Sequence, residues 1–438
     1  MMEALKEHRL MKRLAAINRE STAERTMFAR GAGAKGSFRP YMSMRDYTRA
    51  DFLLDPDKET PVFVRFSKGA GGGGCGETGR DLRGFSTRFY TDFGNYDMIC
   101  GSLPVFYTNR PEKMPALIKV LKRAREGNIS QPQEFWSFAA ENPELAPMIL
   151  HLYGEQGNIK SYRHMAGYSA NTYLWRNRRD EGFLARYTWL PMKGIQGIAR
   201  QEGEFLAGFD PDAVSRDLYE SLKEGEAAEY ELLVQLVPSG KEEDFSFALT
   251  DATKLWPEKL LPPVKIGKLR LTEPAADYLA EVEKAAFSPA NLVDGIEFSR
   301  DPLLPVMAFA MEDCQRHRLG PDYEALAVNR SRAPEDGEAG DLAAKWADKG
   351  WENNLGTEKD DEGDSGEQTG ARPHCKPDFY TQAGEHYGGL SQEQRRRLED
   401  NIADDMMFID EEIQKKMLGH FLSADQGLGK RIAKRLSF

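Results

Sequence analysis

Several short stretches of the chain alternate apolar and polar side chains, which is the pattern of strands with one buried face. They span residues 61–67, 84–91, 95–99, 172–175, 183–190 and 229–237. A tight turn separates 84–91 from 95–99, and a charged turn separates 172–175 from 183–190. Strands joined in this way pair as antiparallel hairpins. The pattern therefore favours a barrel or sandwich over a doubly wound parallel sheet.

Other stretches repeat apolar residues at helical spacing, and strand signals fade after Lys265. We expect helices over 1–24, 111–125, 133–153, 211–223, 272–287 and within 391–438. Asp210 is the expected cap of the helix 211–223, and Ser391 with Gln394 forms a capping-box pattern.

Helix signals are most complete in the segment 301–323. Asp301 is suited to cap a helix, and Gly320 is suited to end it. The residues between 303 and 311 are almost all apolar, so we expect this helix to be buried on most sides. Helical spacing aligns one sulfur-rich stripe, formed by Met307, Met311, Cys314 and Arg318. On pattern alone, ordinary core packing explains such a stripe better than a site does, because Met and Cys commonly fill cores.

Three glycine-rich stretches predict irregular structure. Gly31, Gly33 and Gly36 have GxGxxG spacing, but no buried strand precedes them, so we expect turns and no dinucleotide site. The glycines between 69 and 79 lack the Gly-Lys-Ser/Thr ending of a phosphate loop and predict a flexible connection. The acidic stretch 333–372 has the composition of a linker or a poorly ordered wrap.

Composition limits the partners of the protein. The chain has 438 residues, 40% hydrophobic side chains and a formal net charge of -11. This acidic balance argues against a nucleic-acid surface, and no apolar run has the length of a membrane span. The first residues form no apolar signal core, so we expect a cytoplasmic protein.

Taken together, the motifs of this chain resemble those of the haem catalases over about residues 25–330 and 376–438. The matching stretches are AERTMFARGAGAKGSF, PVFVRFS, RGFSTRFYTDFGNYDM, SYRHMAGYSANTY, DATKLWPE, AAFSPANLVDGI, QRHRLGPDY and DFYTQAGEHY. The resemblance implies an α+β fold, a catalase-like antiparallel eight-stranded β-barrel with helical insertions, a wrapping segment and a C-terminal helical domain. The implied parts are an arm 1–24, a barrel domain 25–270, a wrapping segment 271–375 with the helix 302–319 and the linker 333–372, and a helical domain 376–438.

The resemblance also implies where the peroxide site lies. In the family, a distal histidine shuttles a proton between the peroxide oxygens and an amide orients the substrate. The histidine position holds Phe28, two residues before the arginine of the GAG segment, and the amide position holds Ser102. Ser67, which bonds the histidine in the family, is present. A phenyl ring cannot carry a proton, so these catalytic positions are largely degenerate.

The proximal positions have changed as well. The family's iron ligand is a tyrosine seven residues before the last arginine of QRHRLG, and the arginine that keeps it ionised lies one turn earlier. These positions hold Met311 and Met307. The residues that meet the haem propionates in the family are present as Arg25, Arg65 and Arg318, although ordinary salt bridging explains them equally well.

These substitutions leave several interpretations. The first is a catalase-family protein that lacks peroxide dismutation or nearly lacks it. The second is a haem-binding oxidoreductase of peroxidase type, in which Met311 or Cys314 binds the haem iron. The third is a non-enzymatic ligand-binding or scaffold protein that uses 333–372 as its contact. Haem binding therefore stays open.

The resemblance also bears on other ligands and on assembly. NADPH binding would involve the segment with Arg163 and His164, but we do not expect it, because Asn171 replaces a histidine common in the family. We expect self-association as a homotetramer or homodimer, and a small-molecule ligand in the haem cavity.

Overall fold

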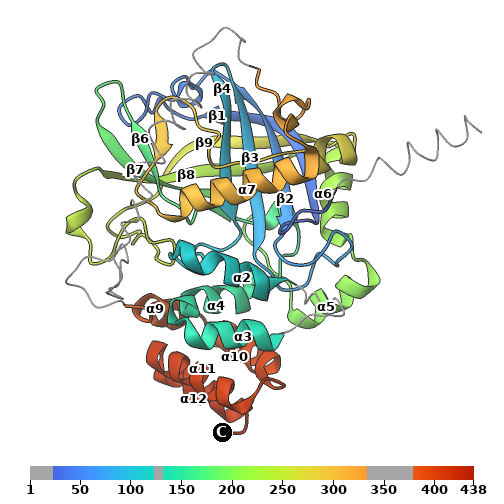
Figure 1. Ribbon diagram of the computed structural model, residues 1–438, viewed down its shortest axis with the longest axis vertical. Helices are drawn as coiled ribbons and strands as arrows, with labels where there is room; N and C mark the ends of the chain where they lie inside the picture. Colours follow the sequence, from blue (N-terminus) through green and yellow to red (C-terminus); the bar gives the residue numbers. More distant parts are fainter. Residues whose placement is uncertain (1–22, 123–131, 333–377) are drawn as a thin grey trace, which may run out of the picture.

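The computed structural model describes residues 23–122, 132–332 and 378–438. Eight antiparallel strands form a closed barrel in the order β7-β5-β4-β3-β2-β1-β9-β8, because β8 also pairs with β7 (Figure 1). The strands are β1 (Gly31–Pro40), β2 (Thr60–Lys68), β3 (Arg83–Thr91), β4 (Gly94–Gly101), β5 (Gly167–Tyr168), β7 (Gly182–Pro191), β8 (Ala228–Pro238) and β9 (Val264–Pro274). Two short strands, β6 (Tyr173–Arg176) and β10 (Ile296–Phe298), extend the sheet beyond β7. The predicted antiparallel barrel is confirmed.

Alternation along each strand separates the barrel core from its outer wall. On β2, Val62, Val64 and Phe66 belong to the aromatic core inside the barrel. Phe63, Arg65 and Ser67 alternate with them and therefore face the outside. The candidate site lies on this outer side of β2, β3 and β4.

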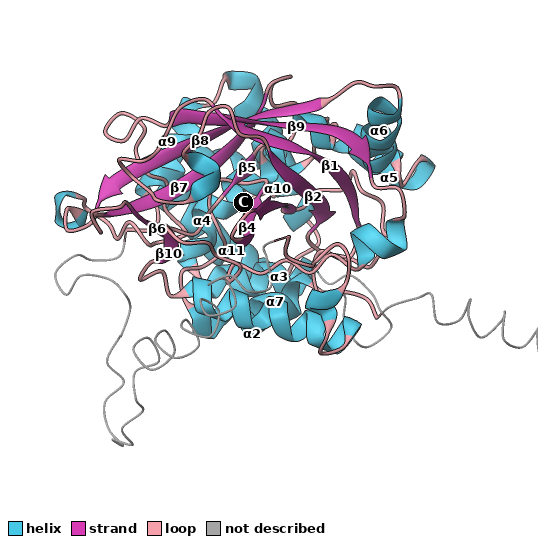
Figure 2. Ribbon diagram, turned by 90° about the horizontal axis from the view of Figure 1, so that it is seen from above, coloured by secondary structure: helices cyan, strands magenta, loops and turns pink. Residues whose placement is uncertain are grey.

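One helix, α7 (Leu303–Leu319), lies across this outer side, and both views place it outside the barrel (Figures 1 and 2). Pro302 is the cap residue, so the expected cap at Asp301 is displaced by one position, but the Asp301 carboxylate still accepts a hydrogen bond of 2.9 Å from the backbone N–H of Leu303. The expectation that this helix is buried on most sides is wrong. Leu304, Ala308 and Arg318 are buried, whereas Phe309 is 56% exposed, because only one face of α7 packs on the protein.

A helical layer packs at one end of the barrel (Figure 1). It contains η2 (Pro111–Lys113), α2 (Met114–Leu121), α3 (Pro132–Glu141), α4 (Ala146–Tyr153), α9 (Thr381–Gly389), α10 (Gln392–Met406), α11 (Glu411–Ala424) and α12 (Gln426–Arg435). These helices share one hydrophobic core, and Trp136 on α3 donates a 2.9 Å hydrogen bond to Asp405 on α10. The capping box of Ser391 and Gln394 is confirmed. The single helix expected over 133–153 is wrong, because Pro143 follows a break at Asn142.

The strands β1 and β9 differ most from the structure that the sequence predicts. The glycines at GxGxxG spacing lie inside β1, where turns were expected. They permit close strand pairing, since a Cβ at Gly31 would lie 2.3 Å from the Phe66 carbonyl oxygen, and one at Gly36 would lie 2.0 Å from that of Arg270.

Residues after Lys265 form β9, although strand signals fade there. The helix expected over 272–287 is reduced to a π-helical turn, Tyr278–Glu283. The prediction that Asp210 caps the helix 211–223 is also wrong. Asp210 ends α5 (Arg200–Phe209), a helix that was not predicted, and Asp212 precedes α6 (Ala213–Lys223).

The predicted helix 1–24, apart from its last two residues, and the acidic segment 333–372 lie outside the described residues. Within the described part of the chain, no helix combines the length and the apolar character needed to cross a bilayer.

Candidate functional site

The distal positions meet on adjacent strands. Ser67 on β2 pairs with Gly84 on β3, which pairs with Gly101 on β4. A Cβ built on Gly84 would lie 2.6 Å from the Ser67 hydroxyl oxygen and 3.3 Å from the Phe28 ring. Glycine is therefore required at position 84, and the structure brings Phe28 and Ser67 together over it.

Phe28 has a strained backbone. Its φ is 59°, in the left-handed region that bulky side chains rarely adopt. Its N–H donates to the carbonyl of Gly69 at 2.9 Å, and its own carbonyl accepts a 2.9 Å hydrogen bond from Arg65. These contacts hold the phenyl ring against the outer wall of the barrel, although the conformation costs about 1–2 kcal/mol.

The Ser102 side chain is hydrogen-bonded to Arg83 at the start of β3. Its hydroxyl accepts a 3.0 Å hydrogen bond from the N–H of Arg83, and its N–H donates to the carbonyl of Arg83 at 2.8 Å. The side chain is 2% exposed. Because a hydroxyl offers one donor where an amide offers two, Ser102 cannot reproduce the contacts of an amide at this position.

The three predicted propionate ligands form one buried cluster. Arg25, Arg65 and Arg318 are 8%, 4% and 6% exposed. Arg25 and Arg318 each reach the Glu283 carboxylate at 3.0 Å. Among the described residues, Arg65 donates only to backbone carbonyls and its Nε has no partner. Burial lowers the pKa of Arg65, and burial together with the charges of Arg65 and Arg318 lowers the pKa of Arg25.

Glu283 is the functional residue that the sequence analysis missed. It ends the π-helical turn, and it also accepts a 3.0 Å hydrogen bond from the Tyr278 hydroxyl. Arg25 and Arg318 therefore share the Glu283 carboxylate, and no ion pair joins Arg65 to a carboxylate among the described residues. No sequence motif points to Glu283. The one indication that an acidic residue must lie near the arginines is physical, because buried arginines require an anionic partner.

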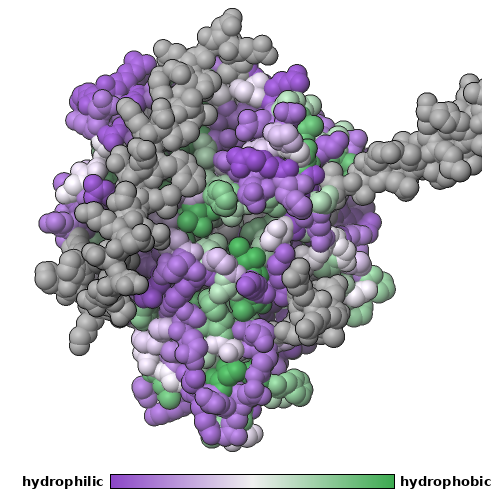
Figure 3. All heavy atoms as spheres, viewed as in Figure 1, coloured by the Kyte–Doolittle hydropathy of each residue, from purple (hydrophilic) through white to green (hydrophobic). Residues whose placement is uncertain are grey.

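The sulfur-rich stripe of α7 is split between two environments. Met311 packs against an outer-wall cluster that includes Phe63 and Phe287, and Met307 is half-buried one turn earlier. Cys314 is half-buried about one turn before Arg318 on the same helix. Figure 3 shows apolar side chains gathered on the surface between α7 and α2.

The segment considered for NADPH is occupied by ion pairs. Arg163 pairs with Asp217 at 2.6 Å and with Glu226 at 2.8 Å, and Asn171 donates a 3.1 Å hydrogen bond to Asp301. A separate cavity of about 330 Å³ lies beside α4 and α10 and is lined by residues that include Arg80, His151, His386 and Arg397. Neither Arg163 nor Asn171 lines it.

Comparisons with known proteins agree with this architecture. The Catalase family model matches residues 2–354, and the model of the Catalase-related immune-responsive domain matches 373–436. The catalase of Methanosarcina barkeri is 36% identical over 98% of this chain and 88% of its own length. The bromoperoxidase-catalase of Streptomyces venezuelae is 36% identical over 97% of this chain and 91% of its own length.

Solved structures are similar over almost the whole chain. Catalase A from Saccharomyces cerevisiae superposes with a TM-score of 0.87 and 29% identity, covering 99% of this chain and 93% of the other. A bacterial catalase gives a TM-score of 0.89 with 28% identity, covering 99% and 90%. Fold, motif order and similarity over nearly the full length agree, and the chain belongs to the catalase family.

Proposed function

We propose that this catalase-family protein has lost hydrogen-peroxide dismutation and keeps a pocket for an anionic, mainly apolar ligand. The phenyl ring of Phe28 over Gly84 is the observation that carries the proposal. Dismutation needs a group within hydrogen-bond reach of the peroxide that accepts and returns a proton. Phe28 cannot exchange a proton, and the Ser102 hydroxyl is already bonded to the N–H of Arg83.

The arginine cluster supports the ligand part of the proposal. Arg25, Arg65 and Arg318 carry three positive charges against the one carboxylate of Glu283, and the Nε of Arg65 has no partner. A buried cluster with a surplus of positive charge is stabilised by an added anion. Two carboxylates would balance this surplus, so the cluster fits the propionates of haem.

Haem is the second part of this proposal, with Met311 as the residue that would bind the iron. Met311 packs against the outer-wall cluster that includes Phe63, whereas Cys314 lies one turn closer to Arg318 along α7. A methionine thioether is a suitable soft ligand for haem iron. Bound haem would supply one-electron redox chemistry. Arg25, Arg65 and Arg318 would hold its carboxylates. Phe28 would cover one face without carrying a proton.

Two measurements on one preparation test these proposals. Protein expressed with added iron and haem precursor should release almost no oxygen from hydrogen peroxide, and brisk release would overturn the loss of dismutation. An absorption spectrum tests haem independently, because a Soret band that disappears in Met311→Leu supports methionine ligation. A haem-free wild-type spectrum after reconstitution with haem would sink the haem part and leave the first part standing.

We also propose self-association as a homotetramer or homodimer. Phe205 and Phe209 on α5 stack at 5.4 Å between ring centroids and are 64% and 76% exposed, which is unusual for the surface of an isolated chain. Light scattering after size-exclusion chromatography tests this proposal, and a mass near 49.4 kDa would contradict it.

A further inference from the structure

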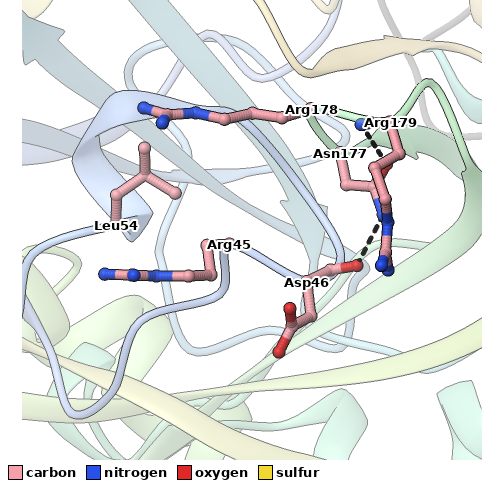
Figure 4. A pocket seen from close by; sticks show the side chains of 6 residues that line it. All are labelled: Arg45, Asp46, Leu54, Asn177, Arg178 and Arg179. Carbon is pink, nitrogen blue, oxygen red and sulfur yellow. Dashed lines mark hydrogen bonds between the residues drawn. The ribbon is translucent and has the colours of Figure 1, made fainter.

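A second cavity lies where the loop after β1 meets the turn between β6 and β7 (Figure 4). Its volume is about 340 Å³, and its lining residues are Arg45, Asp46, Leu54, Asn177, Arg178 and Arg179. None of these residues belongs to the cluster around Phe28, Glu283 and Met311. The volume is at the lower end of the range for sites that hold small molecules.

Asn177 fixes the shape of this cavity. The residue is 1% exposed, and its amide nitrogen donates to the Asp46 carbonyl at 2.8 Å and to the Glu181 carboxylate at 2.7 Å. Its amide oxygen accepts from the N–H groups of Arg179 and Glu181 at 2.9 and 3.0 Å. All of its hydrogen-bonding capacity is thus used to join the loop to the turn, and the walls are held in place before any ligand binds.

The acidic residues of the turn are already engaged elsewhere. Asp180 binds Arg49 at 2.8 Å, and Glu181 binds Arg179 at 2.9 Å. The carboxylate of Asp46 points away from the guanidiniums of Arg45 and Arg178 (Figure 4). Asp46 also lines the cavity, but among the described residues no ion pair joins its carboxylate to either of those two guanidiniums.

Arg45 and Arg178 extend side by side, with Leu54 between their guanidinium groups (Figure 4). Arg45 makes a single hydrogen bond of 3.1 Å, from Nε to the Ser43 hydroxyl. Neither guanidinium forms an ion pair with any residue in the described ranges. Two uncompensated guanidiniums on one cavity are notable in a chain whose net charge is -11.

We propose that this cavity binds the phosphate group of a small phosphorylated molecule. Guanidiniums form paired hydrogen bonds with phosphate oxygens, and two of them match the charge of a phosphate monoester. Leu54 supplies an apolar contact between them for the body of the ligand. Asp46, on the opposite side, accepts a hydrogen bond from a hydroxyl or amino group of that body. The site would act independently of the ligand pocket beside α7.

Calorimetric titration of the full-length protein with inorganic phosphate and with glycerol 3-phosphate, at constant ionic strength, tests the proposal. Arg45→Ala and Arg178→Ala should each weaken glycerol 3-phosphate binding at least tenfold. Arg39→Ala is the matched control, because this exposed guanidinium pairs with Asp57 and does not line the cavity, and it should change binding less than twofold.

Thermal unfolding of each variant checks that the exposed substitutions leave the fold intact. Equal binding by the wild type and the Arg45→Ala/Arg178→Ala variant would overturn the proposal. It would also be overturned if neither phosphate compound bound the wild type, or if acetate bound as tightly as glycerol 3-phosphate.

Discussion

Phe28 combines a side chain without acid–base chemistry and a backbone conformation that suits few phenylalanines. Histidine and asparagine adopt positive φ more readily than phenylalanine does. Position 28 therefore accepts a histidine without rearrangement of the turn, since its backbone contacts with Gly69 and Arg65 involve no side-chain atom of Phe28. This makes the distal site directly testable by substitution.

The first prediction separates haem binding from proton transfer. Met307→Arg with Met311→Tyr should tighten haem binding, because a phenolate kept ionised by an arginine binds ferric iron strongly. Oxygen release from peroxide should stay at background, because Phe28 remains. Adding Phe28→His should raise the rate by at least a hundredfold. Brisk dismutation by the double variant alone would show that the role given to Phe28 is wrong.

The second prediction concerns the shared carboxylate. Glu283→Gln leaves Arg25 and Arg318 without their anionic partner, and removal of one member of a buried charge cluster costs about 3–5 kcal/mol. Urea unfolding should show this loss, and added haem or a dicarboxylate should restore part of it. Glu281→Gln is the control. Its pair with Lys35 is partly exposed and should contribute less than about 1 kcal/mol.

Most residues of the candidate site could be named from the sequence, but the carboxylate that pairs with its arginines could not. Phe28, Met307 and Met311 stand at recognisable motif positions, so the resemblance placed them without a structure. Glu283 lies in no motif that specifies a function, and it meets Arg25 only across 258 residues of sequence. Contacts of this kind depend on the fold and are invisible to local patterns.

At the scale of elements, local patterns failed where neighbouring strands override them. Glycine is unfavourable in strands, yet β1 contains Gly31, Gly33 and Gly36, because the backbones of its neighbours approach too closely for a side chain. The break between α3 and α4 was locally predictable. Pro143 disfavours a continuous helix, but the helical spacing of apolar residues on both sides of it suggested one. The long β2, β3, β7 and β8 were predictable because their alternation is regular.

The third prediction concerns the start of α7. Burial raises the pKa of Asp301 to about 6, against hydrogen bonds from Thr172, Leu303 and Asn171. An acid whose pKa is higher in the folded state stabilises that state at low pH and loses this contribution as pH rises through about 6. The difference in unfolding free energy between wild type and Asp301→Asn should therefore shift in favour of wild type from pH 7 to pH 4. A difference that stays constant over this range would contradict the assignment.

The fourth prediction concerns the contact of α4 with α9. The rings of His151 and His386 lie 3.9 Å apart between centroids. Burial, with a smaller contribution from His386, lowers the pKa of His151, and burial lowers the pKa of His386. A base whose pKa is lowered by folding stabilises the fold at pH values above its ordinary pKa of 6.5. This contribution is lost as the pH falls below that value.

Urea unfolding at pH 7.5 and pH 5.5 measures the effect. His386→Phe should lose less stability than wild type between these pH values, because one buried imidazole no longer resists protonation. His317→Asn is the control, since His317 is exposed on α7, and it should behave as wild type. An unchanged acid sensitivity in His386→Phe would exclude the histidine pair as its source.

At the scale of the whole molecule, the C-terminal helices share one hydrophobic core with α2, α3 and α4, which lie between β4 and β5 in the chain. α3 and α4 pack with α10, α11 and α12, although about 250 residues separate the contacts. The proposed division at residue 376 thus marks a change in sequence character, while the packing runs across it. The resemblance predicted the two parts, but only the structure shows how they share apolar surface.

The fifth prediction follows from this core. A chain ending at residue 377 should be insoluble or aggregate, because Trp136 and Met148 on α3 and α4, both fully buried, would become exposed. Asp405→Ala is a milder test, since it removes only the acceptor of the Trp136 and Tyr153 hydrogen bonds, and should lower stability by about 1–3 kcal/mol. A soluble, monodisperse truncated protein with wild-type melting temperature would contradict this prediction.

The attachment of α7 has a kinetic consequence. Its first turn is tied down through Asp301, its last turn is tied down through Arg318, and its middle presents Phe309 to solvent. The barrel strands beneath it form a closed ring and cannot part to admit a molecule. Under the proposed function, a ligand held between α7 and the barrel would be released when one end of the helix detaches. Its residence time would then follow how often those ends open, and its affinity would follow the residues that it contacts.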